Sequence, residues 1–419
     1  MPTIDPTSTE RASGDIDTSY GLDGYQRINP DNAEFYQAFG LSLTNNDHAL
    51  IAGAMQVTLP SHIRVQFVLM CRDKNGALVR DFDKQGSVTG SFKNDEPMWG
   101  SYGTKTFVTR DGSLLLFGET HNHANMWMPS LASFHGDGSL DINYGENGTY
   151  VLPSPLPGES GSHGKSVVNA AIQSTGSIVT LYQYVHETNF WGGLLSRILP
   201  DGVLDNTFNG GQGYAETLTL GGEIFSPSAL ALQPSDRILV AGNTEDNRGI
   251  KCGMIQRYDK HGRRTKFAGN GEHRVQGYHY AHLVSVDSAI LICGSVPEGA
   301  LLYKLDSDGM PHADFDERPV ITAEVTAWCK VLAQGERIYA IGIINEGFSS
   351  EAVLACFTSM GKPVDSFGPS GNGRVLLAFG GQNNQPIDLA IDSQNRVLVL
   401  GSAKGSIGAE SFLIACFFA

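Results

Sequence analysis

The sequence repeats one two-part pattern along its whole length, and this repeat restricts the possible folds more than any other feature. The first part is an apolar, β-branched run that usually ends in glycine, at 49–53, 114–118, 177–182, 237–242, 289–294, 337–342 and 396–401. The second part is a glycine turn followed five or six residues later by an aromatic residue, opening at Gly14, Gly76, Gly138, Gly202, Gly262, Gly309 and Gly361. Each part occurs seven times, so the chain contains seven copies of one unit.

Each unit spans roughly fifty to sixty residues and contains four short strand-like stretches without a convincing helical period. One copy shows all four, at 228–233, 237–242, 251–259 and 273–276. A four-stranded twisted sheet cannot bury both of its faces alone, whereas radial stacking of such sheets buries both. The sequence therefore predicts an all-β fold, a seven-bladed β-propeller in which the four strands of each blade run from the axis outward.

The two parts of the pattern are offset at the ends of the chain. A turn module opens the sequence at Gly14, whereas the chain ends after the apolar run at 396–401 and one further strand-like stretch. We expect residues 14–30 to supply the missing outer strand of the last blade, because a ring closed by both termini leaves no open sheet edge at the seam. On this interpretation residues 11–419 form a single domain and residues 1–10 a disordered tail.

The unit resembles the delta-60 repeat of bacterial propellers, in which a strand ending in glycine and a strand ending in Arg precede a turn of the form DG-S-L-D-x-x-F/Y-G. Residues 138–148 (GSLDINYGENG) and 196–209 (SRILPDGVLDNTFN) match this pattern closely. The resemblance covers nearly the whole chain, but the modules at Gly262, Gly309 and Gly361 lack the Asp three residues after the glycine. The family is defined by architecture and shares no catalytic residues, so the resemblance implies a fold and not a function.

Two positions that recur among the turn modules are expected to have structural roles. The aromatic residue is expected to pack between adjacent blades; it is Tyr20, Phe82, Tyr144, Phe208, Phe267, Phe315 and Phe367 in the seven modules. Asp17, Asp141 and Asp205 fill the Asp position, where we expect their carboxylates to accept hydrogen bonds from turn amides. Calcium binding is the alternative, but each copy offers one or two carboxylates at most.

Charge and composition bear on partners and location. A net charge of -15 without a Lys/Arg stripe disfavours nucleic acid and anionic lipid as partners, and no stretch approaches eighteen apolar residues. The N-terminus does not have the form of a Sec-type signal peptide. The six cysteines lack CxxC pairing and are expected to be reduced and buried. These features favour a soluble, cytoplasmic protein, with export by another route left open.

Tryptophan, histidine and glutamate gather in segments that the predicted topology places on one face of the ring. If the four strands of a blade are lettered A to D from the axis outward, this face carries the B to C loops and the D to A crossovers between blades. The candidate ligand-binding residues are Trp99, Glu119, His121, His123, Trp127, His163, His186, Glu187 and Trp191. Trp127 and Trp191 each lie eleven residues before a turn glycine, so we expect them at equivalent positions on neighbouring blades. Tryptophan side chains can stack on an apolar or sugar ring while His and Glu supply hydrogen bonds.

Several functions remain compatible with this constellation. The leading hypothesis is a non-catalytic binding or scaffold protein that recognises a glycan, small-molecule or protein ligand on this face. An enzyme with His and Glu acting at the channel mouth is the first alternative, and a structural module of a secreted or toxin-related complex is the second. A metal held by His121, His123 and His186 is a weaker interpretation. No cofactor is indicated, because the sequence contains no phosphate-binding loop and no HExxH motif.

Overall fold

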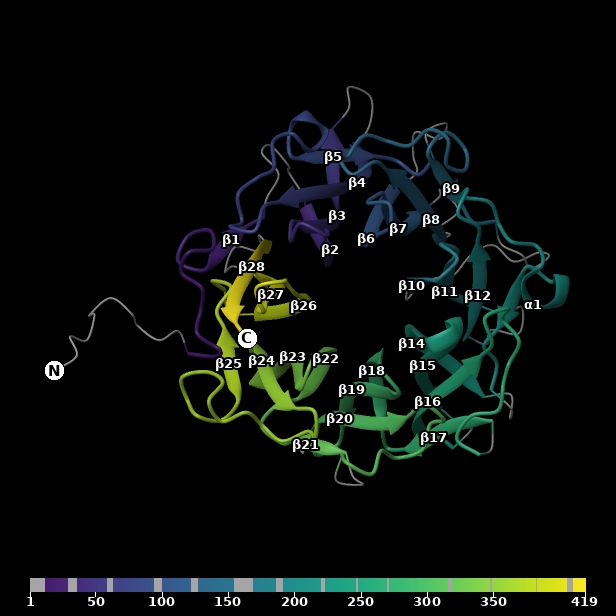
Figure 1. The fold of residues 1–419 in the computed structure, drawn as a ribbon. Coiled ribbons are helices and arrows are strands. Elements are labelled where there is room, and N and C mark those ends of the chain that lie inside the picture. Colours follow the sequence, from purple (N-terminus) through teal and green to yellow (C-terminus); the bar gives the residue numbers. More distant parts are fainter. Residues whose placement is uncertain are drawn as a thin grey trace.

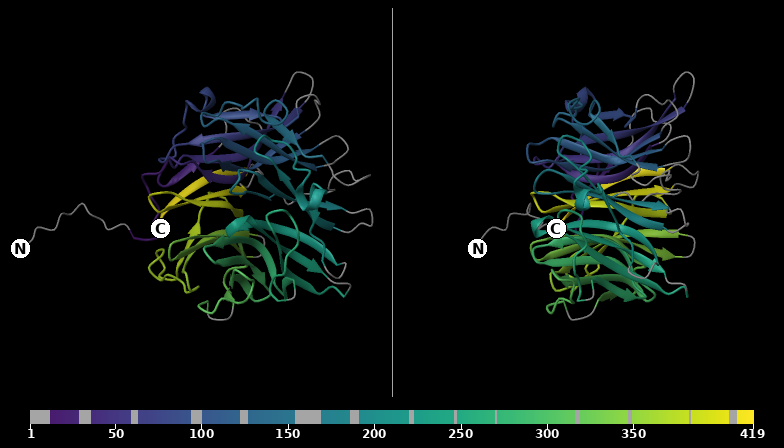
Figure 2. Two further views of the ribbon diagram at one scale, coloured as in Figure 1. Left: turned by 45° about the vertical axis from the view of Figure 1, so that its right-hand side comes forward. Right: turned by 90° about the vertical axis from the view of Figure 1, so that its right-hand side faces the viewer.

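The computed structural model describes residues 12–28, 36–58, 63–93, 100–121, 127–153, 169–185, 191–219, 223–245, 248–269, 271–315, 319–346, 349–381, 383–404 and 410–419. Within these residues the protein is all-β, and its sheets stand side by side around a central axis in a propeller-like ring (Figure 1). Seen from the side, the strands run across the thickness of the ring (Figure 2).

Five sheets contain four antiparallel strands each, hydrogen-bonded in sequence order. The first two comprise β2 (Tyr36–Leu43), β3 (Ala49–Thr58), β4 (Ile63–Arg72) and β5 (Ser87–Gly90), then β6 (Gly100–Val108), β7 (Leu114–His121), β8 (Trp127–Phe134) and β9 (Thr149–Val151). The third and fourth comprise β10 (Asn169–Ile172), β11 (Ile178–Val185), β12 (Trp191–Ile198) and β13 (Tyr214–Glu216), then β14 (Ile224–Gln233), β15 (Arg237–Glu245), β16 (Lys251–Tyr258) and β17 (Glu272–Gln276). The fifth comprises β18 (His279–Val286), β19 (Ala289–Val296), β20 (Gly299–Asp306) and β21 (Val320–Thr322).

The remaining eight strands form one sheet that contains both ends of the chain. Its strands are β22 (Ala327–Gln334), β23 (Arg337–Glu346), β24 (Ser349–Thr358), β25 (Arg374–Leu377), β26 (Asn383–Ile391), β27 (Arg396–Lys404), β28 (Glu410–Phe418) and β1 (Tyr25–Arg27). Two four-stranded halves are joined only by a single parallel pair, Ser350 with Asn383. In the second half β1 pairs with β28, so the N-terminal strand completes a sheet made otherwise by the C-terminal strands (Figure 1).

Helical structure in the described part of the chain is limited to single turns. They are α1 (Phe208–Gly211) and the 3₁₀ turns Phe82–Lys84 and Pro234–Asp236. No helix there has the length and apolarity needed to cross a bilayer.

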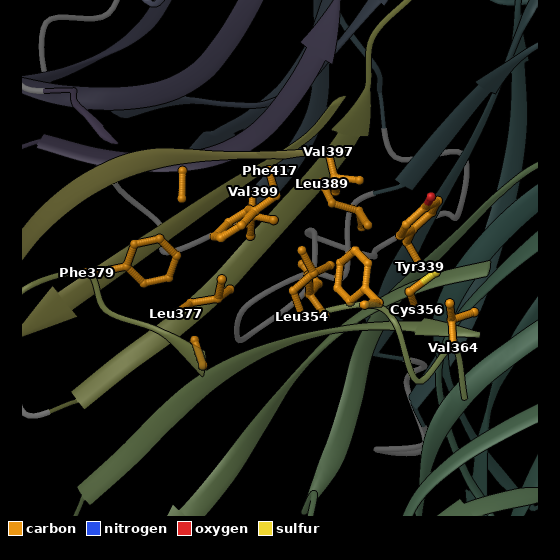
Figure 3. Packing of buried hydrophobic residues seen from close by; sticks show 14 of the residues in the cluster. Tyr339, Leu354, Cys356, Val364, Leu377, Phe379, Leu389, Val397, Val399 and Phe417 are labelled. Atoms are coloured by element: carbon orange, nitrogen blue, oxygen red, sulfur yellow. The ribbon is translucent and has the colours of Figure 1, made fainter. Parts of the chain in front are cut away.

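The hydrophobic core lies between neighbouring sheets. In Figure 3, Tyr339 and Leu354 from β23 and β24 pack with Val399 and Phe417 from β27 and β28. The cluster at the seam is built in the same way, with Ile414 of β28 against Ile51 of β3. Each sheet thus buries both faces against its neighbours, which is why four short strands suffice for each unit.

The aromatic residue of each turn module packs between neighbouring sheets, as the sequence predicted. All seven turn aromatics are buried, none more than 4% exposed. The glycine of the following module approaches the ring so closely that a Cβ on Gly262 would lie 2.3 Å from Cζ of Phe208. The amide after the aromatic also donates to the next module, as Gly145 N does to Asp201 O at 2.9 Å. The equivalent hydrogen bond joins the last turn module to the N-terminal one, from Gly368 N to Ser13 O at 3.0 Å.

The second strand of most sheets also contains a glycine where the inner strand approaches too closely for a side chain. In six of the innermost strands the register with the second strand shifts by one residue, as between Gly103 and Lys105 in β6. In five of these six strand pairs the shift brings a carbonyl of the inner strand over the glycine of the second strand. A Cβ on Gly118 would lie 2.0 Å from the Tyr102 carbonyl oxygen. The bulge and the glycine therefore require each other.

The turn aspartates accept hydrogen bonds from turn amides, as predicted. Asp141 Oδ1 accepts from Asn143 N at 3.1 Å and Asp205 Oδ1 from Thr207 N at 2.9 Å. Asp205 differs from Asp141 because it also forms an ion pair with Arg197 at 2.6 Å, with both side chains largely buried.

This difference predicts unequal costs of mutation. Asp141→Ala should lower the free energy of unfolding by about 1 kcal/mol, the value of turn hydrogen bonds. Asp205→Ala should cost about 3 kcal/mol or more, because it leaves the largely buried Arg197 guanidinium without its carboxylate partner. Urea unfolding of the two variants measures both values, and equal costs would contradict a stabilising role for the ion pair.

Candidate functional site

A cavity of about 580 Å³ lies at the axis of the ring, bordered mainly by the innermost strands. We call it the channel cavity; its lining residues are Gln37, Phe39, Tyr102, Thr104, Lys105, Glu119, Trp127, Asn169, Ser228, Ala281, His282, Cys329, Lys330 and Asp388. Glu119 lies on β7 and Trp127 on β8. The other lining residues come from the seven innermost strands, which are β2, β6, β10, β14, β18, β22 and β26. Every sheet around the axis thus contributes residues from an innermost strand, and the sheet with β6 to β9 also contributes from β7 and β8.

An aromatic group forms one side of the channel cavity. The Trp127 ring lies 5.2 Å from the Tyr102 ring and stacks on the His121 ring at 4.5 Å, measured between centroids. Phe39 extends the group, with its ring 6.4 Å from that of Tyr102. The pairing of β6, β7 and β8 brings these residues together, because Tyr102 is opposite Glu119 and His121 is opposite Trp127.

Four ionisable residues form a narrow layer at the bottom of the channel cavity, which we call the waist: Lys105, His282, Lys330 and Asp388. The same four residues also border a second cavity of about 530 Å³, lined mostly by aliphatic residues further along the inner strands. Each waist residue directly follows the bulge of its inner strand, so the four share one register position. The waist therefore divides the channel into a polar, aromatic side and an aliphatic side.

The charges at the waist are only partly paired. Asp388 Oδ1 lies 2.7 Å from Lys330 Nζ, and the Asp388 carboxylate also accepts from the amides of Leu41 and Leu389 at 3.0 Å. The Lys105 ammonium instead lies 5.0 Å from the centroid of the Phe107 ring, and no carboxylate among the described residues forms an ion pair with it.

Enclosure changes the protonation of the waist. Burial, together with the charge of Lys330, lowers the pKa of Lys105 to about 8, and the Asp388 carboxylate opposes this shift. Burial, with Lys330 and Lys105, lowers the pKa of His282 to about 3, so its imidazole is neutral at neutral pH. His282 Nδ1 accepts from Val331 N at 3.4 Å, which places the ring proton on Nε2. Burial also raises the pKa of the Cys329 thiol to about 11, so it is not a thiolate nucleophile.

The structure brings together only part of the predicted site. Glu119, His121 and Trp127 lie close to one another, but they belong to strands β7 and β8 and not to the B to C loop where they were expected. Trp127 and Trp191 are both the first residue of the third strand of their sheets, at the equivalent positions that the spacing predicted. The remaining candidates lie outside the described residues: Trp99, His123, His163, His186 and Glu187.

The sequence reasoning missed the waist altogether. Lys105, His282, Lys330 and Asp388 lie on inner strands that were assigned a structural role only. The available signal was a charged or titratable residue within an otherwise apolar inner strand, as in AWCKVLA and QPIDLAI. The cysteines were predicted correctly in five cases, which are buried, whereas Cys329 is half-buried and borders the channel cavity.

No group of three or more His, Cys, Asp or Glu side chains within the described ranges is arranged to hold a metal ion.

Comparison with known proteins supports the fold and leaves the activity open. No family model matches the chain, and no curated protein sequence is similar to it. Among solved structures, the polysaccharide lyase Uly1 superposes with a TM-score of 0.51 at 11% identity, covering 95% of this chain and 93% of that chain. An α-L-arabinanase of Penicillium chrysogenum in complex with arabinobiose superposes with a TM-score of 0.45 at 11% identity, covering 93% of this chain and 97% of that chain. At such low identity the likeness to the lyase shows the fold alone.

Proposed function

We propose that this protein is a non-catalytic recognition propeller that binds a carbohydrate ligand in the channel cavity. The observation that carries the proposal is the meeting of an aromatic group and polar side chains around one cavity of about 580 Å³. Trp127 and Tyr102 offer apolar ring faces, while Gln37 and Asn169 offer amide groups that can pair with hydroxyls. A concave site of this volume suits a small ligand or a chain end, whereas a protein partner requires a larger surface.

The proposal includes a ring of seven blades related to the delta-60 repeat. Five blades are the separate four-stranded sheets, and the eight-stranded sheet supplies two more, whose strands pair with each other only at Ser350 and Asn383. Residues 11–419 then form one domain whose last blade contains β1. The seven turn modules support this count, because each carries one buried aromatic residue.

A glycan array of neutral and acidic oligosaccharides probed with the full chain tests the proposed function. We expect retention of a restricted set of sugars and no retention of the array's sugar-free linkers. An array without bound protein, repeated at high protein concentration, would overturn the proposal and direct the search to protein ligands.

Truncation of Trp127 should weaken binding of the retained sugar. Aromatic residues at the centre of a site carry much of its binding energy, so Trp127→Ala should cost about 2 kcal/mol or more. Titration calorimetry measures the affinity, and Lys362→Ala in an exposed turn module serves as the control. Unchanged affinity in Trp127→Ala would show that the role of this ring is packing.

An enzyme that acts on the same ligand is the second candidate. The observation in its favour is Lys105, because an amine with a pKa of about 8 can exchange protons near neutral pH. Mass spectrometry of the retained oligosaccharide after long incubation separates the two functions. An unaltered sugar supports recognition, whereas shortened products that disappear in Lys105→Met would establish catalysis.

A further inference from the structure

We infer that the waist binds an anionic group of the ligand, so that the carbohydrate is acidic, with a carboxylate or a sulfate placed between Lys105 and Lys330. This inference rests on the proposed function and names the ligand class of the same site. At the level of the waist, two lysines face one carboxylate.

The waist carries a surplus of positive charge in a chain whose net charge is -15. Among the described residues Asp388 has the only carboxylate at this level, and that carboxylate already pairs with Lys330 and accepts hydrogen bonds from two backbone amides. The second lysine, Lys105, has an aromatic ring as its described contact. An enclosed ammonium without a carboxylate is costly, and an incoming anion removes that cost.

The geometry supports a ligand anion at the waist and not elsewhere in the channel. Lys105 and Lys330 both border the channel cavity that contains Trp127, so one small molecule can contact the aromatic group and the waist. On the far side of the waist the lining is mostly aliphatic, with Leu41, Leu232, Leu332 and Leu389. A charged group is therefore favoured at the waist and disfavoured beyond it.

The other ionisable groups near Lys105 do not cancel this preference. Lys330 adds positive charge, Asp388 is neutralised by Lys330, and His282 is uncharged at neutral pH. Glu119 lies on β7, opposite Tyr102 and thus nearer the aromatic group. Lysine is a compact point charge, so it does not distinguish a carboxylate from a sulfate by shape.

The test compares glucuronate, glucose 6-sulfate and glucose as probes of the full chain by titration calorimetry or ligand-observed NMR. We expect at least one anionic sugar to bind about tenfold or more tightly than glucose, as for a charge-assisted contact. Lys105→Met should reduce that preference to nearly none, while Lys260→Met, which removes an exposed lysine, should preserve it. Thermal melts of both variants establish that they fold.

Dependence on pH provides a second measure that does not require a mutation. Lys105 is charged below its pKa of about 8 and loses its proton above it. The affinity for the preferred anionic sugar should therefore fall about tenfold between pH 7 and pH 9, whereas glucose binding should stay constant.

The outcomes separate this inference from the proposed function. Equal binding of glucose and both anionic sugars, or a preference that survives in Lys105→Met, would overturn the anion site and leave carbohydrate recognition intact. Absence of binding for all three probes, together with an empty glycan array, would overturn both. The relative affinities of glucuronate and glucose 6-sulfate identify whether the anion is a carboxylate or a sulfate.

Discussion

Removal of residues 1–30 should abolish cooperative unfolding or leave the protein insoluble. The deleted segment contains β1, which pairs with β28, and Ser13, whose carbonyl accepts the amide of Gly368. It also contains Tyr20, which is fully buried in the core cluster between the last and first sheets. Without these contacts the ring would have an open edge and an exposed core at its seam.

An ion network at the seam adds to this expectation. Arg396 on β27 pairs with Asp17 at 2.9 Å and with Asp392 at 2.7 Å, and it donates to the Lys74 carbonyl at 2.7 Å. All three charged side chains are nearly inaccessible to solvent. Loss of Asp17 alone leaves the guanidinium incompletely paired, which typically costs about 3 to 5 kcal/mol.

Thermal unfolding followed by circular dichroism measures the effect of the deletion. Deletion of residues 1–10 is the matched control, because it removes none of the described seam contacts, and it should leave the melting temperature unchanged. A chain lacking residues 1–30 that still unfolds in one transition at the wild-type temperature would show that β1 is dispensable for closure.

The second large effect is expected at the turn aromatics. Tyr144→Ala and Phe208→Ala should each lower the free energy of unfolding by about 3 to 5 kcal/mol, as other core aromatic truncations do. Each ring is buried between two sheets, and the Phe208 ring also lies 5.1 Å from the Arg197 guanidinium.

Tyr144→Phe provides a control at the same position. The Tyr144 hydroxyl is buried without a hydrogen-bond partner among the described residues, so its removal should change stability little or increase it. Urea unfolding measures the three variants. If Tyr144→Phe proved as destabilising as Tyr144→Ala, the hydroxyl and not the ring would fasten the two sheets.

The fold could be predicted from the sequence because its determinants are local and repeated. Each turn glycine is followed five or six residues later by an aromatic residue, and the structure shows that this aromatic residue lies against the glycine of the next module. The offset of the repeats likewise predicted the pairing of β1 with β28. Repetition makes one local pattern visible seven times, so imperfect copies such as that at Gly309 can still be recognised.

The candidate site was predicted only in part because it depends on convergence around the axis. Trp127 was found from its residue type and its spacing to a turn glycine. Lys105, His282, Lys330 and Asp388 come from four different inner strands and meet because each follows a one-residue bulge. A bulge shifts every later side chain of a strand to the other face, so simple alternation along an inner strand does not show which residues face the axis.

A crystal structure of the protein with the oligosaccharide retained on the array would show where the ligand binds. We expect electron density for a sugar ring in the channel cavity, against Trp127 and Tyr102, with an anionic substituent directed to Lys105 at the waist. Density for the sugar on an outer surface of the ring, with no sugar at the axis, would contradict the assignment of the channel cavity as the binding site.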